Sequence, residues 1–266
     1  MFDPRAGLLA FGLVAALALA TWIASLWRRD VSIVDGMWPV FIGSAGMLYA
    51  WLGDALATPA LIALVLLGVW AVRLCVHITV RNHGQPEDRR YQKIRANNQP
   101  NFEFKSLYIV FGLQAALAWI VALPFMTITA GSEPRTALWA LPGLLLAAFG
   151  IGFEAVADWQ LERFKKRPDA RERVLDSGLW RYSRHPNYFG ECCAWWGFGL
   201  VALGMDPGAW WTLASPVLMT ILLLKVSGVT LLEKDIGERR PEYARYVRET
   251  SAFLPRPPRA TRAATT

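Results

Sequence analysis

The stretch Gly7–Trp27, GLLAFGLVAALALATWIASLW, decides the fold of this chain. It carries no charged residue, and it matches the roughly 20 apolar residues that a helix needs to cross a hydrocarbon core about 30 Å thick. Ala18-Leu19-Ala20 resembles a signal-peptidase site, but no strongly positive region precedes it and the apolar run continues through Leu26. We therefore expect this stretch to be retained as a first transmembrane helix.

Counting this stretch, seven apolar segments are long enough to span a membrane: Gly7–Trp27, Ser32–Leu52, Pro59–Val80, Leu107–Thr129, Leu138–Gln160, Tyr188–Gly204 and Trp210–Leu232. Their apolar residues are continuous rather than alternating, which favours helices over a membrane barrel. No internal repeat typical of duplicated transporters is present. We therefore expect an all-α integral membrane protein, with one seven-helix domain over residues 1–255 and a disordered basic tail over residues 256–266.

The composition of the 266-residue chain agrees with this class of protein. Apolar residues make up 54% and charged residues 18%, against about 45–50% and 25% in soluble domains. Three cysteines are too few for a disulfide framework, and three histidines argue against a multi-ligand metal site. No soluble basic module remains once the seven segments are removed, so we expect no nucleic acid as a partner. No obligate protein partner is evident either.

The net charge of +7 is distributed unevenly along the chain. Most of the 28 lysines and arginines lie in every second connection, at 28–29, 81–105, 163–184 and 234–262. Basic connections stay on the cytoplasmic side of a membrane. The pattern predicts seven crossings with the N-terminus outside and the C-terminus in the cytoplasm.

Several ionisable residues fall within the predicted helices, where charge is costly. They are Asp35, Arg73, His77, Glu154, Asp158, Glu191, Lys225 and Glu233. Any one of them alone fits a snorkelling side chain or a structural ion pair. Glu154 and Asp158 are four residues apart and so share one helical face. Taken together, these residues favour a polar cavity inside the bundle.

Hydrogen-bonding side chains are densest in Ser177–Glu191, SGLWRYSRHPNYFGE. Pro186 disfavours helix at the preceding residue and is well suited to begin one itself. A helix N-terminus beside Arg181 and Arg184 offers N–H groups and positive charge to a phosphate. The alternative is an interfacial belt of aromatic and basic residues, which explains Trp180 and Tyr182 but not the other polar side chains. We therefore interpret this stretch as a ligand site.

These residues resemble the C-terminal signature of the steroid 5-alpha-reductase family, and in particular its bacterial DUF1295 branch. The signature is Arg-His-Pro-Asn-Tyr-x-Gly-Glu, here Arg184–Glu191, after Gly-Leu-Trp-x-Tyr-Ser from Gly178. Further matching segments are Ser32–Trp38, Trp70–Leu74, Gly84–Tyr91, Phe153–Asp158, Leu232–Lys234, Arg240–Tyr243, Tyr246 and Phe253–Pro255. The resemblance spans most of the chain and is most specific in its C-terminal half.

The resemblance implies a seven-helix reductase that uses NADPH to saturate the C4–C5 double bond of a 3-oxo-delta-4 steroid or a similar enone lipid taken from the bilayer. It places the cofactor in residues 150–255. The residues implied are Glu154, Asp158, Lys165, Lys166, Trp180, Tyr182, Arg184, His185, Asn187, Tyr188, Glu191, Glu233, Arg239, Arg240 and Tyr246. Among these, Lys165, Lys166, Arg239 and Arg240 are the candidates for the cofactor phosphates.

The catalytic residues expected from the resemblance are Asp35, Trp70 and Arg73. The animal enzymes carry a glutamate on the second helix and a tyrosine on the third, whereas here Asp35 is the acid available in the second segment and Trp70 stands near the tyrosine position. Hydride addition to the beta carbon of an enone requires a donor at the carbonyl oxygen, and one such donor is worth roughly 2.7–4 kcal/mol. A protonated Asp35 is our hypothesis for that donor; the alternatives are a helix cap or a partner of Arg73.

Two other functions fit parts of the sequence. An isoprenylcysteine-type methyltransferase shares the Arg-His-Pro-x-Tyr-x-Gly pattern, but it uses S-adenosylmethionine, which has no phosphate, and usually has paired glutamates where this chain has Glu233-Lys234. A non-enzymatic lipid-binding protein explains the uneven charge but not Glu154, Asp158 and Glu191. No Gly-x-Gly-x-x-Gly occurs, so a dinucleotide would have to bind outside a Rossmann domain.

Overall fold

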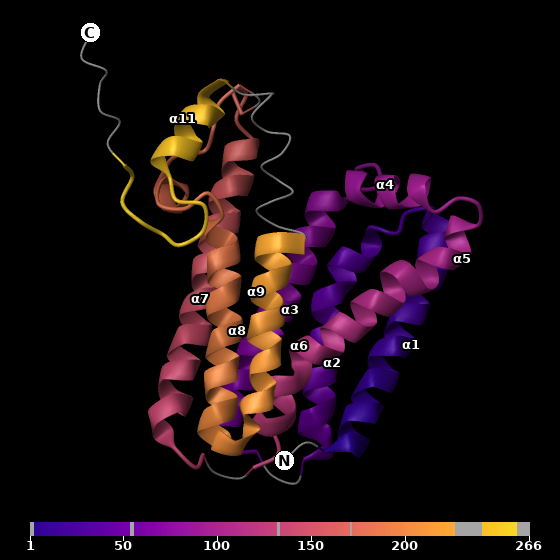
Figure 1. The fold of residues 1–266 in the computed structure, drawn as a ribbon, viewed down its shortest axis with the longest axis vertical. Coiled ribbons are helices and arrows are strands. Elements are labelled where there is room, and N and C mark those ends of the chain that lie inside the picture. The colour runs from indigo at the N-terminus through magenta and orange to yellow at the C-terminus, as the bar shows by residue number, and fades with distance from the viewer. Residues whose placement is uncertain (1–2, 54–55, 132–133, 171, 227–240, 260–266) are drawn as a thin grey trace. The chain divides into compact units, whose positions relative to one another are not determined.

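The computed structural model describes residues 3–53, 56–131, 134–170, 172–226 and 241–259. Within these ranges the chain is helical and contains no strand, so the predicted all-α class is confirmed (Figure 1). The helices are α1 (Pro4–Arg28), α2 (Ile33–Leu52), α3 (Thr58–Asn82), α4 (Arg89–Asn97), α5 (Phe102–Ser106), η1 (Leu107–Gly112), α6 (Leu113–Ile128), α7 (Ala137–Lys165), η2 (Gly178–Arg181), α8 (Pro186–Met205), η3 (Pro207–Leu213), α9 (Ala214–Ile221), η4 (Leu222–Val226) and α11 (Pro241–Glu249).

Six helical stretches are long and apolar enough to cross a membrane: Pro4–Arg28, Ile33–Leu52, Thr58–Asn82, Phe102–Ile128, Leu138–Lys165 and Pro207–Lys225. They support an integral membrane protein. The sixth predicted segment, Tyr188–Gly204, forms the 20-residue helix α8, which is long enough but not among the six. Its first turns carry Asn187 and Glu191, which lower its mean hydropathy. Seven spans and their orientation therefore remain predictions.

The chain divides into two compact units, and the single seven-helix domain over residues 1–255 stays a prediction. Unit 1 is Met1–Leu144 with Phe198–Ser215, and unit 2 is Leu145–Gly197 with Pro216–Thr266. Unit 2 resembles the predicted cofactor half, residues 150–255, except that Phe198–Ser215 belongs to unit 1. Hydropathy locates helices along the chain but does not say which of them share contacts, and this is why the division was not predicted.

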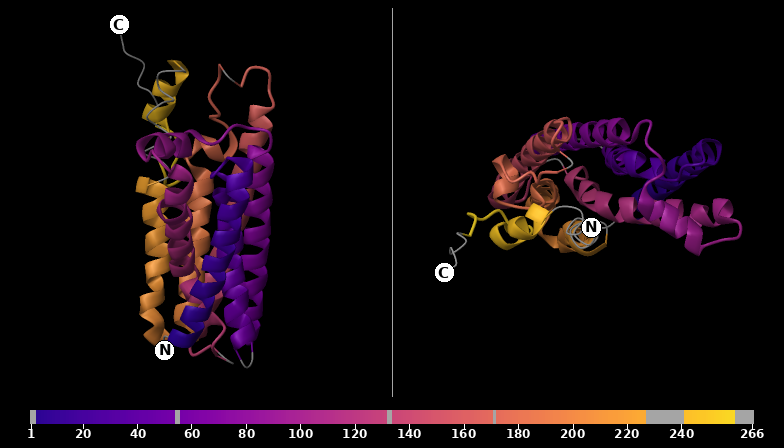
Figure 2. Two further views of the ribbon diagram at one scale, coloured as in Figure 1. Left: turned by 90° about the vertical axis from the view of Figure 1, so that its right-hand side faces the viewer. Right: turned by 90° about the horizontal axis from the view of Figure 1, so that it is seen from above.

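In unit 1, the helices α1, α2, α3 and α6 pack against one another (Figure 2). Helix α1 begins at Pro4 because the Asp3 side chain accepts hydrogen bonds from the amides of Arg5 and Ala6, at 2.9 and 3.2 Å. It ends at Arg29, whose φ of 53° is left-handed. The short polar helix α4 lies across the end of this unit rather than along its long helices (Figures 1 and 2).

In unit 2, α7 and α8 approach each other closely at two glycines. A Cβ added at Gly190 of α8 would lie 2.6 Å from the Glu154 amide nitrogen and 2.7 Å from the Gly150 carbonyl oxygen. A Cβ added at Gly150 would in turn collide with the main chain at Ala194 and Gly190. The contact is between backbones, so only glycine fits at either position. This crossing sets the distance between the acids of α7 and the polar residues that begin α8.

Candidate functional site

The first element of the candidate site is the stretch that leads into α8. Gly178 begins η2 with a left-handed φ of 62°, and a Cβ there would lie 2.6 Å from the Gln160 side chain. The Leu179 amide donates to Gln160 Oε1 at 2.9 Å, which ties this turn to α7. Helix α8 then begins at Pro186, as the sequence predicts. The prediction that Pro186 begins a helix is confirmed.

Three buried acids lie on α7 and α8. Glu154 is 4% exposed, Asp158 6% and Glu191 5%. The Asn187 amide donates to Asp158 Oδ1 at 3.1 Å, and the Trp195 indole donates to Glu191 Oε1 at 2.8 Å. The predicted acids are thus brought together with the first turns of α8 inside unit 2.

The C-terminal segment of unit 2 is fastened to the same stretch. The Tyr246 hydroxyl of α11 donates to the Trp180 carbonyl at 2.6 Å. The Arg184 guanidinium donates to the carbonyls of Val247 and Thr250, at 3.0 and 2.8 Å. The buried Ser183 hydroxyl donates to the Phe253 carbonyl at 2.7 Å. Trp180, Arg184 and Tyr246, all predicted site residues, therefore lie in one hydrogen-bonded cluster.

The tail predicted to be disordered from residue 256 is ordered over its first residues. The amide of Arg256 donates to the Tyr182 carbonyl, and that of Arg259 donates to the Glu249 carbonyl, both at 2.9 Å. A Pro-rich, basic composition does not reveal such pairing with a distant segment. Residues 260–266 lie outside the described part of the chain.

Between this tail and α11 lies a basic pocket with a volume of about 270 Å³. Its arginines are Arg184, Arg248, Arg256 and Arg259, and Glu249 is the acid among the residues that line it. Guanidinium groups bind phosphate through paired, charge-assisted hydrogen bonds. This pocket, which we call the arginine pocket, therefore has the chemistry to hold a phosphate group of a dinucleotide.

Some of the remaining predicted cofactor residues lie in the described part of the chain and the others lie outside it. His185 is buried with its ring stacked on Tyr188, with centroids 5.5 Å apart, whereas Tyr182 is exposed. Lys165 pairs with Glu162 of its own helix at 2.8 Å, and Lys166 is exposed beyond the end of α7. Glu233, Arg239 and Arg240 lie outside the described residues, so the structure says nothing of them.

In unit 1, the predicted catalytic residue Asp35 lies in the first turn of α2 and contacts α4. The Tyr91 hydroxyl donates to its Oδ1 at 2.6 Å, and the Arg90 guanidinium donates to its Oδ2 at 2.7 Å. Both carboxyl oxygens therefore accept hydrogen bonds from α4, and the role of Asp35 toward a substrate stays a prediction. Its partner is Arg90 rather than Arg73.

Arg90 and Tyr91 have pKa values well above their ordinary ones. Burial lowers the pKa of Arg90, but the negative charge of Asp35, together with the charge of Asp88 and the hydrogen bond to it, outweighs burial and raises that pKa overall. Burial and then the charge of Asp35 raise the pKa of Tyr91. The guanidinium stays charged and the hydroxyl stays protonated throughout the physiological range, so both remain donors.

The other two predicted catalytic residues lie on α3. Trp70 is fully buried, and Arg73 is half-buried one turn further along the same helix. Their roles stay predictions.

Sequence reasoning missed Arg90 and Tyr91 as partners of Asp35, although Gly84–Tyr91 was among the matching segments. It also missed Arg248, Arg256 and Arg259. The signal was present for the last two, since Arg256-Pro257-Pro258-Arg259 is basic and proline-rich, but that composition fits a disordered tail equally well.

Lowering the pH is expected to loosen α4 from unit 1. Burial would raise the pKa of Glu87, but hydrogen bonds from Arg95 and the Val31 amide outweigh it and hold that pKa below its ordinary value of 4.5. A lowered pKa in the folded state adds stability above the unfolded pKa, and this stability is lost as the pH falls through the folded pKa. Hydrogen exchange at the α4 amides, corrected for the intrinsic rate, should therefore rise below about pH 4.

The variant Glu87→Gln is the control for this transition. It lacks the titrating group, so its α4 amides should already exchange faster at neutral pH and show a smaller change on acidification. Protection of the wild-type α4 that is unchanged down to about pH 2 would contradict the prediction.

The chain is similar to other proteins over most of its length. A family model described as "Protein of unknown function (DUF1295)" matches residues 21–250 of the chain. An uncharacterized protein of the fission yeast Schizosaccharomyces pombe is 26% identical, over 88% of this chain and 75% of the yeast protein. No solved structure matches the chain.

Proposed function

We propose that this chain, which belongs to the DUF1295 family, is a membrane reductase that uses NADPH to saturate the double bond of an apolar enone, with 3-oxo-delta-4 steroids as the substrate class. The observation that carries this proposal is in unit 2. There a pocket with four arginines adjoins the segment Trp180–Arg184, which is hydrogen-bonded to α7, to α11 and to the Phe253 carbonyl. Unit 2 therefore offers both arginines for the phosphates of a ligand and hydrogen-bonding groups for its other polar parts.

The residues of unit 2 fit such a cofactor. Arg248, Arg256 and Arg259 are exposed along the arginine pocket, so their guanidinium groups are available to phosphate oxygens. Asp158 is buried, Asn187 is half-buried, and the two are already hydrogen-bonded to each other, so they would orient polar groups of the ligand without large rearrangement. When bound, NADPH supplies hydride to the beta carbon of the enone.

The residues of unit 1 contribute to this proposal through Asp35. The carboxyl group of Asp35 accepts hydrogen bonds from the Arg90 guanidinium and from the Tyr91 hydroxyl, whose single proton is used in this way. Arg90 uses Nε and one terminal nitrogen toward Asp88 and Asp35, which leaves its other terminal nitrogen able to donate to a carbonyl oxygen. We therefore assign carbonyl polarisation to this remaining terminal nitrogen of Arg90, which Asp35 holds in position, rather than to a protonated Asp35 acting alone.

The proposal also predicts the side of the membrane on which the cofactor binds. The arginine pocket belongs to the basic connections, which positive-inside topology assigns to the cytoplasm, where NADPH is available. In a bacterium the membrane would be the inner membrane, and the apolar substrate would come from the bilayer.

Titration with three ligands tests the proposal. Detergent-purified protein should show a higher thermal midpoint with NADPH, since a ligand at 100 times its dissociation constant adds about 2.7 kcal/mol of stability. NADH, which lacks the 2′-phosphate, should act more weakly. A screen of NADPH oxidation with 3-oxo-delta-4 steroids then identifies the substrate. Stabilisation by S-adenosylmethionine alone would instead favour the methyltransferase alternative.

Two arginines of α11 provide a matched pair for this titration. Arg248→Gln removes a guanidinium from the arginine pocket and should weaken NADPH binding by about tenfold or more, as expected for a charge-assisted hydrogen bond. Arg245→Gln changes the same charge on the same helix, but Arg245 pairs with Asp176 and does not line the pocket. Equal losses in the two variants would show that the pocket is not the phosphate site.

A further inference from the structure

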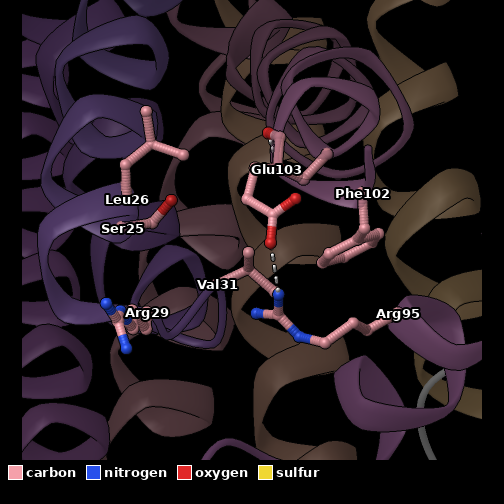
Figure 3. A pocket seen from close by; sticks show the side chains of 8 residues that line it. Ser25, Leu26, Arg29, Val31, Arg95, Phe102 and Glu103 are labelled. Atoms are coloured by element: carbon pink, nitrogen blue, oxygen red, sulfur yellow. Dashed lines mark hydrogen bonds and ion pairs between the residues drawn. The ribbon is translucent and has the colours of Figure 1, made fainter. Parts of the chain in front are cut away.

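Unit 1 contains a second cavity, unrelated to the arginine pocket, with a volume of about 200 Å³ (Figure 3). It is lined by Ser25, Leu26, Arg29, Val31, Arg95, Phe102, Glu103 and Ser106. Figure 3 shows Arg29 and Arg95 on opposite sides of the cavity, with Glu103 between them and Phe102 beside Arg95. Its volume is below the roughly 300–1,000 Å³ of pockets that enclose a drug-sized ligand, so it suits a small polar group.

The charged side chains of this cavity differ in how closely they are paired with opposite charges. Arg95 donates from Nε and one terminal nitrogen to the two carboxyl oxygens of Glu87, at 3.0 and 2.8 Å. Its other terminal nitrogen lies 3.7 Å from Glu103 Oε1, which is a loose contact. In the described part of the chain, the Arg29 guanidinium has no hydrogen bond or ion pair. The cavity thus offers an unpaired positive charge at Arg29 and a loosely paired negative charge at Glu103.

The position of the cavity indicates the source of its ligand. It lies where two candidate membrane spans end, Pro4–Arg28 and Phe102–Ile128. Next to its lining residues, Trp27 is 84% exposed, Phe104 70% and Tyr108 63%. Exposed aromatic side chains at the end of a span are typical of the membrane–water interface. The cavity therefore lies at the depth of lipid headgroups, with apolar surface beside it for acyl chains.

We propose that this cavity binds the headgroup of a phospholipid that carries a primary amine, such as phosphatidylethanolamine. The lipid phosphate pairs with Arg29, because guanidinium groups match phosphate oxygens well. The lipid ammonium pairs with Glu103. Arg29 and Arg95 balance Glu87 and Glu103 in charge, so a zwitterionic headgroup fits the site better than one with a net negative charge.

The test compares lipids that share their acyl chains. Full-length protein is placed in nanodiscs of phosphatidylcholine, alone or mixed with phosphatidylethanolamine or phosphatidylglycerol, and the lipid retained after extraction is counted by native mass spectrometry. We expect at least about tenfold enrichment of phosphatidylethanolamine over phosphatidylcholine, whose quaternary amine cannot donate a hydrogen bond. Equal retention of the two, or stronger retention of phosphatidylglycerol, would overturn the proposal.

Two variants separate lipid binding from folding. Arg29→Gly removes the guanidinium, but glycine readily adopts the left-handed φ of 53°, so the fold should be at least as stable as in the wild type. Glu103→Gln removes the partner of the ammonium. Both should abolish the enrichment, whereas Arg28→Gln, which removes the neighbouring exposed charge outside the cavity, should preserve it. Enrichment that persists in Arg29→Gly would overturn the proposal.

Free phosphoethanolamine distinguishes a lipid from a soluble phosphate ester. The proposal expects it to displace the retained lipid only at concentrations far above those at which the lipid itself competes, because it has no acyl chains to bury beside Trp27 and Tyr108. Displacement at equal concentrations would assign the site to a soluble ligand instead.

Discussion

Replacing Gly190 by alanine is expected to destabilise unit 2 by about 3 kcal/mol or more, at the upper end of the cost of overpacking a tight contact. The added carbon would lie within 2.7 Å of the Glu154 amide nitrogen and the Gly150 carbonyl oxygen. Both are main-chain atoms, so neither is able to rotate away, and α7 and α8 have to move apart. We expect the thermal midpoint in detergent to fall by about 6–12 °C. Stabilisation by NADPH should fall with it, because Asp158 and Asn187 would separate.

The control for this variant is Gly152→Ala in the same helix α7. Gly152 is exposed, and a Cβ there would meet nothing within 4 Å. Alanine at such a helix-interior position is worth about 0.5–1 kcal/mol of added stability. The two variants make the same chemical change, so they should shift the thermal midpoint in opposite directions. Similar midpoints for both would mean that the helix crossing is looser than described here.

Replacing Asp35 by asparagine or alanine is expected to reduce turnover by about 100- to 1,000-fold while NADPH binding is retained. Asp35 accepts from the Arg90 guanidinium and the Tyr91 hydroxyl, and we propose the remaining terminal nitrogen of Arg90 as the donor to the substrate carbonyl. Loss of one such donor costs roughly 2.7–4 kcal/mol of transition-state stabilisation. The measurement is the rate of NADPH oxidation with the enone found in the screen, alongside the NADPH-induced thermal shift. Full activity in both variants would remove Asp35 from the chemistry.

A structural loss at α4 would mimic this effect, and Glu87→Gln controls for it. Glu87 also fastens α4 to unit 1, since it accepts from the Val31 amide at 2.9 Å and pairs with Arg95. It has no proposed part in catalysis. If Asp35 acts by positioning a donor to the substrate carbonyl, Glu87→Gln should retain most of the activity. A comparable loss of activity in Glu87→Gln would show that turnover requires the docking of α4 rather than the donor that Asp35 holds in place.

The positions of the helices could be predicted from the sequence because each is encoded locally. Gly7–Trp27 is continuously apolar and forms α1, and Pro186 restricts the backbone before it and begins α8. The six helices that are long and apolar enough to cross a membrane follow from hydropathy alone. Helix α8 shows the limit of that signal, because a few polar residues in its first turns keep it from the set.

The pairings inside the candidate site could not be predicted, because they join residues far apart in the chain. Asp35 meets Arg90 and Tyr91 across the whole of α3, and hydropathy does not say where a polar loop folds back. The close contact between Gly150 and Gly190 was not predicted for the same reason, because it also joins residues far apart in the chain. Helical periodicity indicates which residues share a face, but not which partner helix that face meets.

The way in which the C-terminal segment is fastened has a practical consequence for handling the protein. Ser183 and Tyr182 bind the segment through the carbonyl of Phe253 and the amide of Arg256, and the last described tie uses the amide of Arg259. Ending the chain at Pro255 would remove both of the later ties along with two arginines of the pocket. An affinity tag or fluorescent fusion is therefore best joined well after Arg259, with a flexible spacer, so that purification leaves these main-chain contacts intact.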